Sequence, residues 1–131
     1  MSLALKARDS ATWGHMDCIV ALATRMVEAL CWFPSQIQAV CWGAYLHDIG
    51  EVAIPDAALL KPGALTVDEQ AVMCSHIERG MTLVAALDFW PDMTLAVVRD
   101  HHERWDGQGY SEGKVGREIS LAGRIFTLCD V

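Results

Sequence analysis

The sequence lacks a long hydrophobic run. No apolar stretch reaches the ~18 residues that a membrane-spanning helix needs, and no signal peptide is visible at its start. It also lacks a basic excess, since 10 Lys and Arg residues stand against 17 Asp and Glu residues, for a formal net charge of −7. Nucleic-acid binding depends on a basic surface. We therefore expect neither DNA nor a membrane as a partner.

The cysteines lack the pairing that is typical of disulfide frameworks and zinc clusters. There are 5 of them, an odd number, and none belongs to a C-x-x-C pair. Most lie within apolar helical patterns, so we expect reduced, buried thiols in a cytoplasmic protein. The five are Cys18, Cys31, Cys41, Cys74 and Cys129.

Strand signals are scarce as well. Residues 52–54 (VAI) form a short apolar run flanked by Gly50 and Pro55, whereas apolar residues recur at helical spacing along nearly the whole chain. A chain of 131 residues, 53% of them hydrophobic, can bury a core of ordinary size. We predict an all-α fold, a single helical bundle over residues 1–131.

The first helix is predicted from one apolar stripe, with His15 one turn before the stripe and on the same inward side. Pro34-Ser35 then breaks the chain and begins a second helix, which stops near Gly50. The stripe of the first helix comprises Ile19, Val20, Ala23, Met26, Val27 and Leu30.

A capping box formed by Thr66 and Glu69 opens a third helix, which carries His76. Gly80 is expected to kink this helix or divide it in two. Pro91-Asp92 opens a further helix, which ends at two adjacent histidines.

Residues 106–118 contain four glycines and no periodicity, which predicts a loop. Ser120 comes after the loop and is suited to cap a last helix. In that helix we expect Leu121, Ile125 and Leu128 to face the core.

All the histidines fall on these helices or at their ends, and one is followed directly by Asp48. A helical bundle can bring side chains from several helices to one interior point, where imidazoles and carboxylates would form a transition-metal site. Adjacent helical residues point ~100° apart, so a His-Asp pair could flank two metals. The alternative is that the doublets are exposed helix ends. The histidines are His15, His47, His76, His101 and His102.

Several motifs then occur in a specific order, and they are HDIG at 47–50, IPDAALLKPGALT at 54–66, His76, HHERWDGQGY at 101–110, and Asp130. In this combination the sequence resembles the HD-GYP subfamily of the HD-domain phosphohydrolases. These are bacterial phosphodiesterases that linearise or fully hydrolyse cyclic di-GMP. The resemblance runs from about residue 9 to residue 131, and it implies that the last helices of the family fold are missing from this chain.

The resemblance implies two transition-metal ions, with iron or manganese the usual choice and zinc possible. A nitrogen-rich ligand set disfavours magnesium and calcium. Some members hold a third metal with an acidic residue whose position here is Ala11. The implied ligands are His15, His47, Asp48, His76, His101, His102 and Asp130.

The resemblance also implies a mechanism, in which a hydroxide shared by the two metals attacks the phosphodiester. Asp48 would bridge the metals. Asp48 and Glu51 would occupy the catalytic positions. Arg104, Gly109 and Tyr110 would lie at the substrate.

Three departures from the family pattern bear on activity. Glu51 stands where the family has a lysine that contacts substrate phosphate, Ser111 replaces the proline of the GYP signature, and the chain stops at Val131, before the family's helix with phosphate-binding arginine and lysine. We therefore carry three hypotheses: a cyclic dinucleotide phosphodiesterase, a degenerate module that binds metal, nucleotide or a protein partner with little turnover, and a phosphohydrolase for another nucleotide. In each, receiver or sensor domains of a larger signalling protein are the expected partners.

Overall fold

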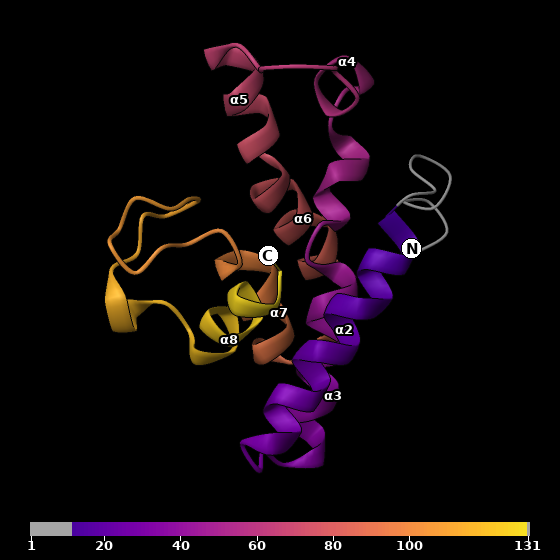
Figure 1. The fold of residues 1–131 in the computed structure, drawn as a ribbon, viewed down its shortest axis with the longest axis vertical. Coiled ribbons are helices and arrows are strands. Elements are labelled where there is room, and N and C mark those ends of the chain that lie inside the picture. The colour runs from indigo at the N-terminus through magenta and orange to yellow at the C-terminus, as the bar shows by residue number, and fades with distance from the viewer. Residues whose placement is uncertain (1–11, 131) are drawn as a thin grey trace.

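The computed structural model describes residues 12–130 as a bundle of helices (Figure 1). Within this range no residues form a strand, and Asp106 and Val115 make one isolated bridge, so the all-α prediction is confirmed. None of these helices is both long enough and apolar enough to cross a membrane. The α-helices are α2 (Thr12–Ala29), α3 (Pro34–Leu46), α4 (Asp56–Leu59), α5 (Val67–Cys74), α6 (His76–Ala85), α7 (Asp92–Asp100) and α8 (Leu121–Cys129), and the 3-10 turns are η1 (Ile49–Ala53) and η2 (Gly116–Glu118).

The main core lies between α2, α3, α7 and α8, and α2 runs beside α3 along the long axis of the molecule (Figure 1). The predicted stripe of α2 is largely confirmed, because four of its residues are buried and Met26 packs partly against them. Leu30 is an exception, with 53% of its surface exposed. The helix ends at Ala29 and the chain turns at Cys31 with φ 57°, so Leu30 leaves the stripe.

Helix α8 begins as predicted but turns a different face to the core. Ser120 caps it by accepting a hydrogen bond from the Gly123 backbone N–H at 3.0 Å, and Ile125 is buried. Leu121 and Leu128, expected inside, are 51% and 64% exposed. The buried residues recur at helical spacing one position further along, and small residues on that face let α8 pack closely against α7. They are Ala122, Gly123, Ile125, Phe126 and Cys129.

The third predicted helix is divided, although not at Gly80. Its capping box is confirmed, but the break falls at Ser75, between α5 and α6. The Ser75 hydroxyl donates to the Val72 carbonyl at 2.5 Å, and the His76 ring bonds the Met73 carbonyl at 2.7 Å. Side chains that compete in this way for backbone carbonyls disrupt a helix locally. His76 therefore begins α6.

The cysteines form no disulfide, as predicted, but most of them are not buried. Cys18 and Cys31 are exposed, Cys41 and Cys74 are half-buried, and Cys129 alone is buried. Cys18 lies on the outward side of α2, where its apolar neighbours Ile19 and Val20 face the core, and Cys31 lies in the turn after that helix.

Two glycines allow η1 to pack directly on α6. A β-carbon at Gly50 would overlap the His76 carbonyl and approach the backbone nitrogen of Gly80 to 2.6 Å. A β-carbon at Gly80 would in turn lie 3.2 Å from the Gly50 nitrogen. This contact holds the segment with Asp48 against the start of α6, where His76 lies.

We predict that Gly50→Ala lowers the free energy of unfolding by about 1–3 kcal/mol or more, because backbone has no rotamer with which to relieve the overlap. Urea unfolding followed by circular dichroism would measure the change. Gly14→Ala is the matched control, since a β-carbon there meets nothing within 4 Å and alanine is the better helix former, worth up to about 1 kcal/mol. Wild-type stability in Gly50→Ala would contradict the packing.

Candidate metal centre

Three buried histidines lie where helices end or break. His47 follows α3, His101 follows α7, and His76 follows the break after α5. In each, ring Nδ1 lies at hydrogen-bonding distance from the backbone carbonyl three residues earlier: 2.6 Å to Ala44, 2.7 Å to Met73 and 2.9 Å to Val98. Carbonyls at helix ends lack intrahelical partners, so these positions suit such bonds.

These bonds decide which ring nitrogen is left for a ligand. A carbonyl oxygen only accepts hydrogen bonds, so Nδ1 carries the proton that it donates. In the neutral imidazole, Nε2 is then the nitrogen with a free lone pair. Histidines that ligate metals are commonly held by a hydrogen-bond acceptor on the other ring nitrogen in this way. The backbone thus presents three Nε2 atoms to one point.

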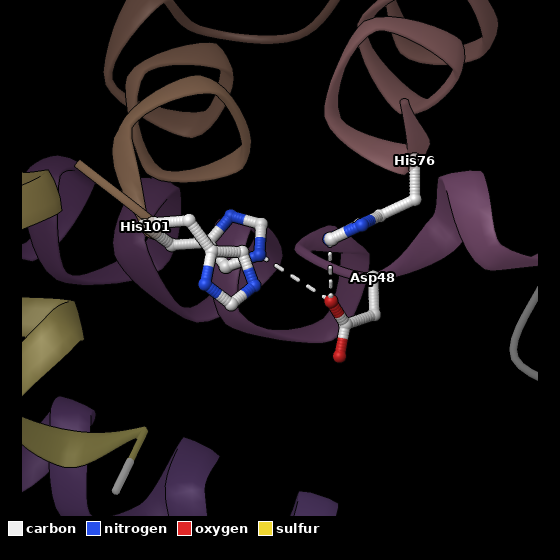
Figure 2. Close-up of side chains that lie close together, drawn as sticks. Asp48, His76 and His101 are labelled. Atoms are coloured by element: carbon white, nitrogen blue, oxygen red, sulfur yellow. Dashed lines mark hydrogen bonds and ion pairs between the residues drawn. The ribbon is translucent and has the colours of Figure 1, made fainter. Parts of the chain in front are cut away.

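The carboxylate of Asp48 lies at that point. Its Oδ2 is 2.9 Å from Nε2 of His47, and its Oδ1 is 3.3 Å from Nε2 of both His76 and His101. Figure 2 shows Asp48 facing His76 and His101, which come from different helices. Because its two oxygens serve different histidines, Asp48 has the arrangement of a bridging ligand.

His102 completes a compact group on the Oδ1 side. One ligand atom from each of four residues lies within 4.8 Å of the others. Burial, together with the neighbouring rings of His101 and His76, lowers the pKa of His102 to about 4, so it is neutral near pH 7. The four residues are Asp48, His76, His101 and His102.

Asp48 and His47 each stabilise the charged form of the other. Burial alone would raise the pKa of Asp48, but the charge of His47 and hydrogen bonds from the rings of His101 and His47 hold it well below its usual range. Burial disfavours protonated His47, yet the carboxylates of Asp48 and Asp130 raise its pKa to about 9. Metal binding at His47 therefore has to displace a proton.

The residues present fit a transition metal. Nε2 of His76 is buried and makes no hydrogen bond, although Asp48 Oδ1 lies 3.3 Å away. A buried polar atom without a hydrogen-bond partner is costly, and a metal ion would satisfy it. Imidazole nitrogens with a shared carboxylate suit iron, manganese or zinc.

The other two predicted ligands, Asp130 and His15, lie at the edge of the group around Asp48. Asp130 Oδ1 is 3.8 Å from Nε2 of His47, and burial raises the pKa of Asp130 against the opposing charge of His47. His15 lies in the first turn of α2 and is exposed, so its predicted inward position is wrong. The buried stripe of α2 starts one turn later, at Ile19. Both ligand roles stay predictions.

Glu51 lies on η1, one turn after Asp48, and is half-buried. Burial and then the charge of Asp48 raise its pKa to about 7, while His76 and His47 act in the opposite direction. The charge of this carboxyl group therefore interacts with the charges of the centre.

Tyr110 is brought to the centre by the loop after His102. Its ring stacks on His102 with centroids 4.7 Å apart and 17° between planes, and it lies 6.3 Å from the ring of His76. Gly109 permits this approach, because a β-carbon there would meet the Glu103 Cα at 2.6 Å. Gly107 has φ +77°, a conformation that favours glycine.

Arg104 is not brought to the centre. Its guanidinium is 65% exposed and binds the Asp106 carboxylate at 2.8 and 3.2 Å. Its predicted role at the substrate stays a prediction that these contacts do not support.

Two buried acids that flank the adjacent histidines were missed from the sequence. Asp100 accepts hydrogen bonds from Lys114 at 2.7 Å and from the Ser120 backbone at 2.9 Å. Glu103 accepts from the backbones of Glu112 and Lys114 at 2.7 and 2.9 Å. The sequence pattern that could have indicated them is the D-H-H-E run at the end of a predicted helix. Acids at such a position can accept hydrogen bonds from the polar loop that follows.

The family model of the HD domain matches residues 2–131. The chain belongs to the HD-domain family. This result confirms the resemblance found in the sequence, and the Asp48 that anchors the centre is the aspartate of the HD dipeptide.

The HD domain is also similar to several longer proteins. It is 36% identical over 132 residues to the cyclic di-GMP phosphodiesterase response regulator RpfG of Xanthomonas campestris, covering 100% of this chain and 35% of that protein. It is 36% identical over 125 residues to a cyclic di-GMP phosphodiesterase of Thermotoga maritima, covering 94% and 34%. It is 33% identical over 129 residues to 3′3′-cGAMP-specific phosphodiesterase 2 of Vibrio cholerae, covering 98% and 25%. The chain thus spans about a quarter to a third of these relatives.

We predict that Mn²⁺, or Fe²⁺ under anaerobic conditions, raises the thermal midpoint of this HD domain by several degrees, since a ligand that binds only the folded state stabilises it. Asp48→Asn should lose most of that shift, because the charge of Asp48 serves both groups of histidines. The matched control is Asp88→Asn, which neutralises an exposed aspartate. An unchanged shift in Asp48→Asn, measured by differential scanning fluorimetry, would contradict the assignment.

Proposed function

We propose that this HD domain is a metal-dependent phosphodiesterase that hydrolyses a cyclic dinucleotide, with cyclic di-GMP as the first candidate. The observation that carries the proposal is the Asp48 carboxylate, whose two oxygens face different histidines. The names of its relatives support the substrate class, because they are called cyclic di-GMP or 3′3′-cGAMP phosphodiesterases.

The ligand geometry supports a proposal of two metal positions. Asp48 Oδ2, His47 and Asp130 would hold one ion, with His15 as a further ligand, and Asp48 Oδ1 would join the second group. Two iron or manganese ions, or zinc, would activate water and take up negative charge on the phosphate. The second group consists of His76, His101 and His102.

The protein side chains would orient the substrate. Tyr110 stacks on His102 and, with Gly109, would form a wall at the side of the metal centre that the dinucleotide contacts. The net charge of −7 opposes an anionic substrate, and bound divalent cations would reverse the field locally.

A second candidate function follows from Glu51. A carboxylate in the field of the centre repels phosphate, and it stands where the resemblance implies a lysine. The domain would then bind metal and nucleotide, or a protein partner, with little turnover.

The setting of the domain is also part of the proposal. The relatives are three to four times longer than their matched portion, and the name of one includes response regulator. We infer that this HD domain acts with receiver or sensor domains in a larger signalling protein. Five free thiols accord with a cytoplasmic location.

We predict that protein loaded anaerobically with iron or manganese converts cyclic di-GMP to linear product. Chromatography of the products would measure turnover, with cyclic di-AMP and 3′3′-cGAMP tested in parallel. The double variant His47→Ala/Asp48→Ala should be inactive because it removes ligands of both positions. Product formation no greater than in this variant, for all three nucleotides, would contradict phosphodiesterase activity.

We further predict that Glu51→Lys increases turnover on the order of 10²-fold, the usual effect of one positioned donor in such a site. Glu28→Lys is the matched control, because it makes the same charge change on an exposed part of α2. Equal turnover in wild type and Glu51→Lys would show that Glu51 does not limit the reaction.

A further inference from the structure

The most deeply buried carboxylate outside the ligand set belongs to Asp100, directly before His101. It is 0% exposed and is surrounded by donors: Lys114 Nζ at 2.7 Å and Arg99 Nε at 3.1 Å on Oδ1, and the Ser120 N–H at 2.9 Å on Oδ2. A buried charge is tolerated only where it is paired and hydrogen-bonded in this way. Gly123 allows the close fit, since a β-carbon there would lie 2.6 Å from the Asp100 Cβ.

Lys114 is held at both ends by the acids that flank the adjacent histidines. Its ammonium binds Asp100, and its backbone N–H donates to Glu103 Oε2 at 2.9 Å. The other oxygen of Glu103 accepts the Glu112 N–H at 2.7 Å. The loop that leaves His102 is therefore tied back to its own starting point, and Glu103 is only 3% exposed.

Tyr110 lies inside this closed loop. Its backbone N–H donates to the His102 carbonyl at 3.1 Å, and its ring stacks on the imidazole of the same residue. Burial raises the pKa of its hydroxyl, and the neighbouring Cys74 at the end of α5 adds to this effect, so the two side chains lie close together. The position of Tyr110 thus depends on how the loop is closed.

We propose that Asp100, Glu103 and Lys114 act as positioning residues, which hold Tyr110 against His102 and so fix the substrate-side wall of the metal centre. The inference rests on the proposed function, which it deepens by assigning residues to the wall. A merely stabilising ion pair would contribute to folding without affecting that wall. The Lys61–Glu69 pair is such a case, with a distance of 2.6 Å and both side chains 31% exposed.

The test compares four variants: Lys114→Met, Asp100→Asn, the two combined, and Lys114→Arg. Lys61→Met is the matched control, because it removes the same charge from an ion pair in the turn before α5. One readout is independent of turnover: the alkylation rate of Cys74 by iodoacetamide, resolved by peptide mass spectrometry, with exposed Cys18 as the internal reference. The second readout is kcat and KM for cyclic di-GMP, and circular dichroism confirms that each variant is folded.

We expect Lys114→Met to raise the relative alkylation rate of Cys74 several-fold, because the Tyr110 side chain would then move away from the neighbouring thiol. It should lower kcat/KM by about 10- to 100-fold, the usual consequence of a small misplacement near reacting groups. The combined variant should lose no more than the worse single variant, since both act through one contact. Lys114→Arg, which keeps a cation, should recover part of the loss, and Lys61→Met should resemble wild type.

Wild-type Cys74 alkylation in folded Lys114→Met, additive losses in the combined variant, or an equal effect of Lys61→Met would each overturn the positioning role. The two proposals fail separately. If the wild-type protein shows no turnover, the proposed function is wrong, whereas the alkylation rates still decide whether the ion pair holds Tyr110.

Discussion

One short carboxylate organises this centre. Asp48 lies among three imidazoles that reach it from the ends of three helical segments, and its two oxygens divide them into two groups. A carboxylate among rings that can be protonated is stable as an anion, and we propose that the same arrangement bridges two metal ions when these replace the protons. The remaining features of the site serve to bring these rings to one carboxylate.

Helix ends supply that geometry. A helix interior uses its carbonyls for its own hydrogen bonds, whereas a helix end leaves them available to the ring of a nearby histidine. His47, His76 and His101 all use this device, so the backbone sets both the ring orientation and the nitrogen that faces inward. The hydrophobic core also packs against one of these rings, since the ring of Phe126 lies 4.8 Å from that of His47. Breaks in the bundle, rather than its regular helices, build the site.

The sequence was sufficient to predict the fold class, because it depends on the spacing of residue types. The expectation that imidazoles and a carboxylate from several helices meet at one interior point agrees with the group formed by Asp48, His76, His101 and His102. The capping box at Thr66 predicted the start of α5 correctly, as a local motif with its own hydrogen bonds. The sequence was not sufficient to predict which of several apolar residues in a helix face the core. The stripe of α8 was assigned one residue too early, because its leucines outweigh the small residues that actually allow close packing.

The spacing of apolar residues also could not predict hydrogen bonds made by polar side chains. The break at Ser75 depends on two side chains that take carbonyls from the helix, and the buried position of Asp100 depends on a lysine 14 residues away. His15 has the spacing of an inward residue, yet the packed part of α2 begins one turn later. Such outcomes depend on tertiary contacts and not on periodicity.

The central claim is that one carboxylate is shared between two metal positions, and metal stoichiometry tests it most directly. Elemental analysis of protein purified anaerobically, with protein concentration from amino-acid analysis, should give two transition-metal ions per chain. Fewer than one ion per chain after reconstitution with iron or manganese would contradict the account.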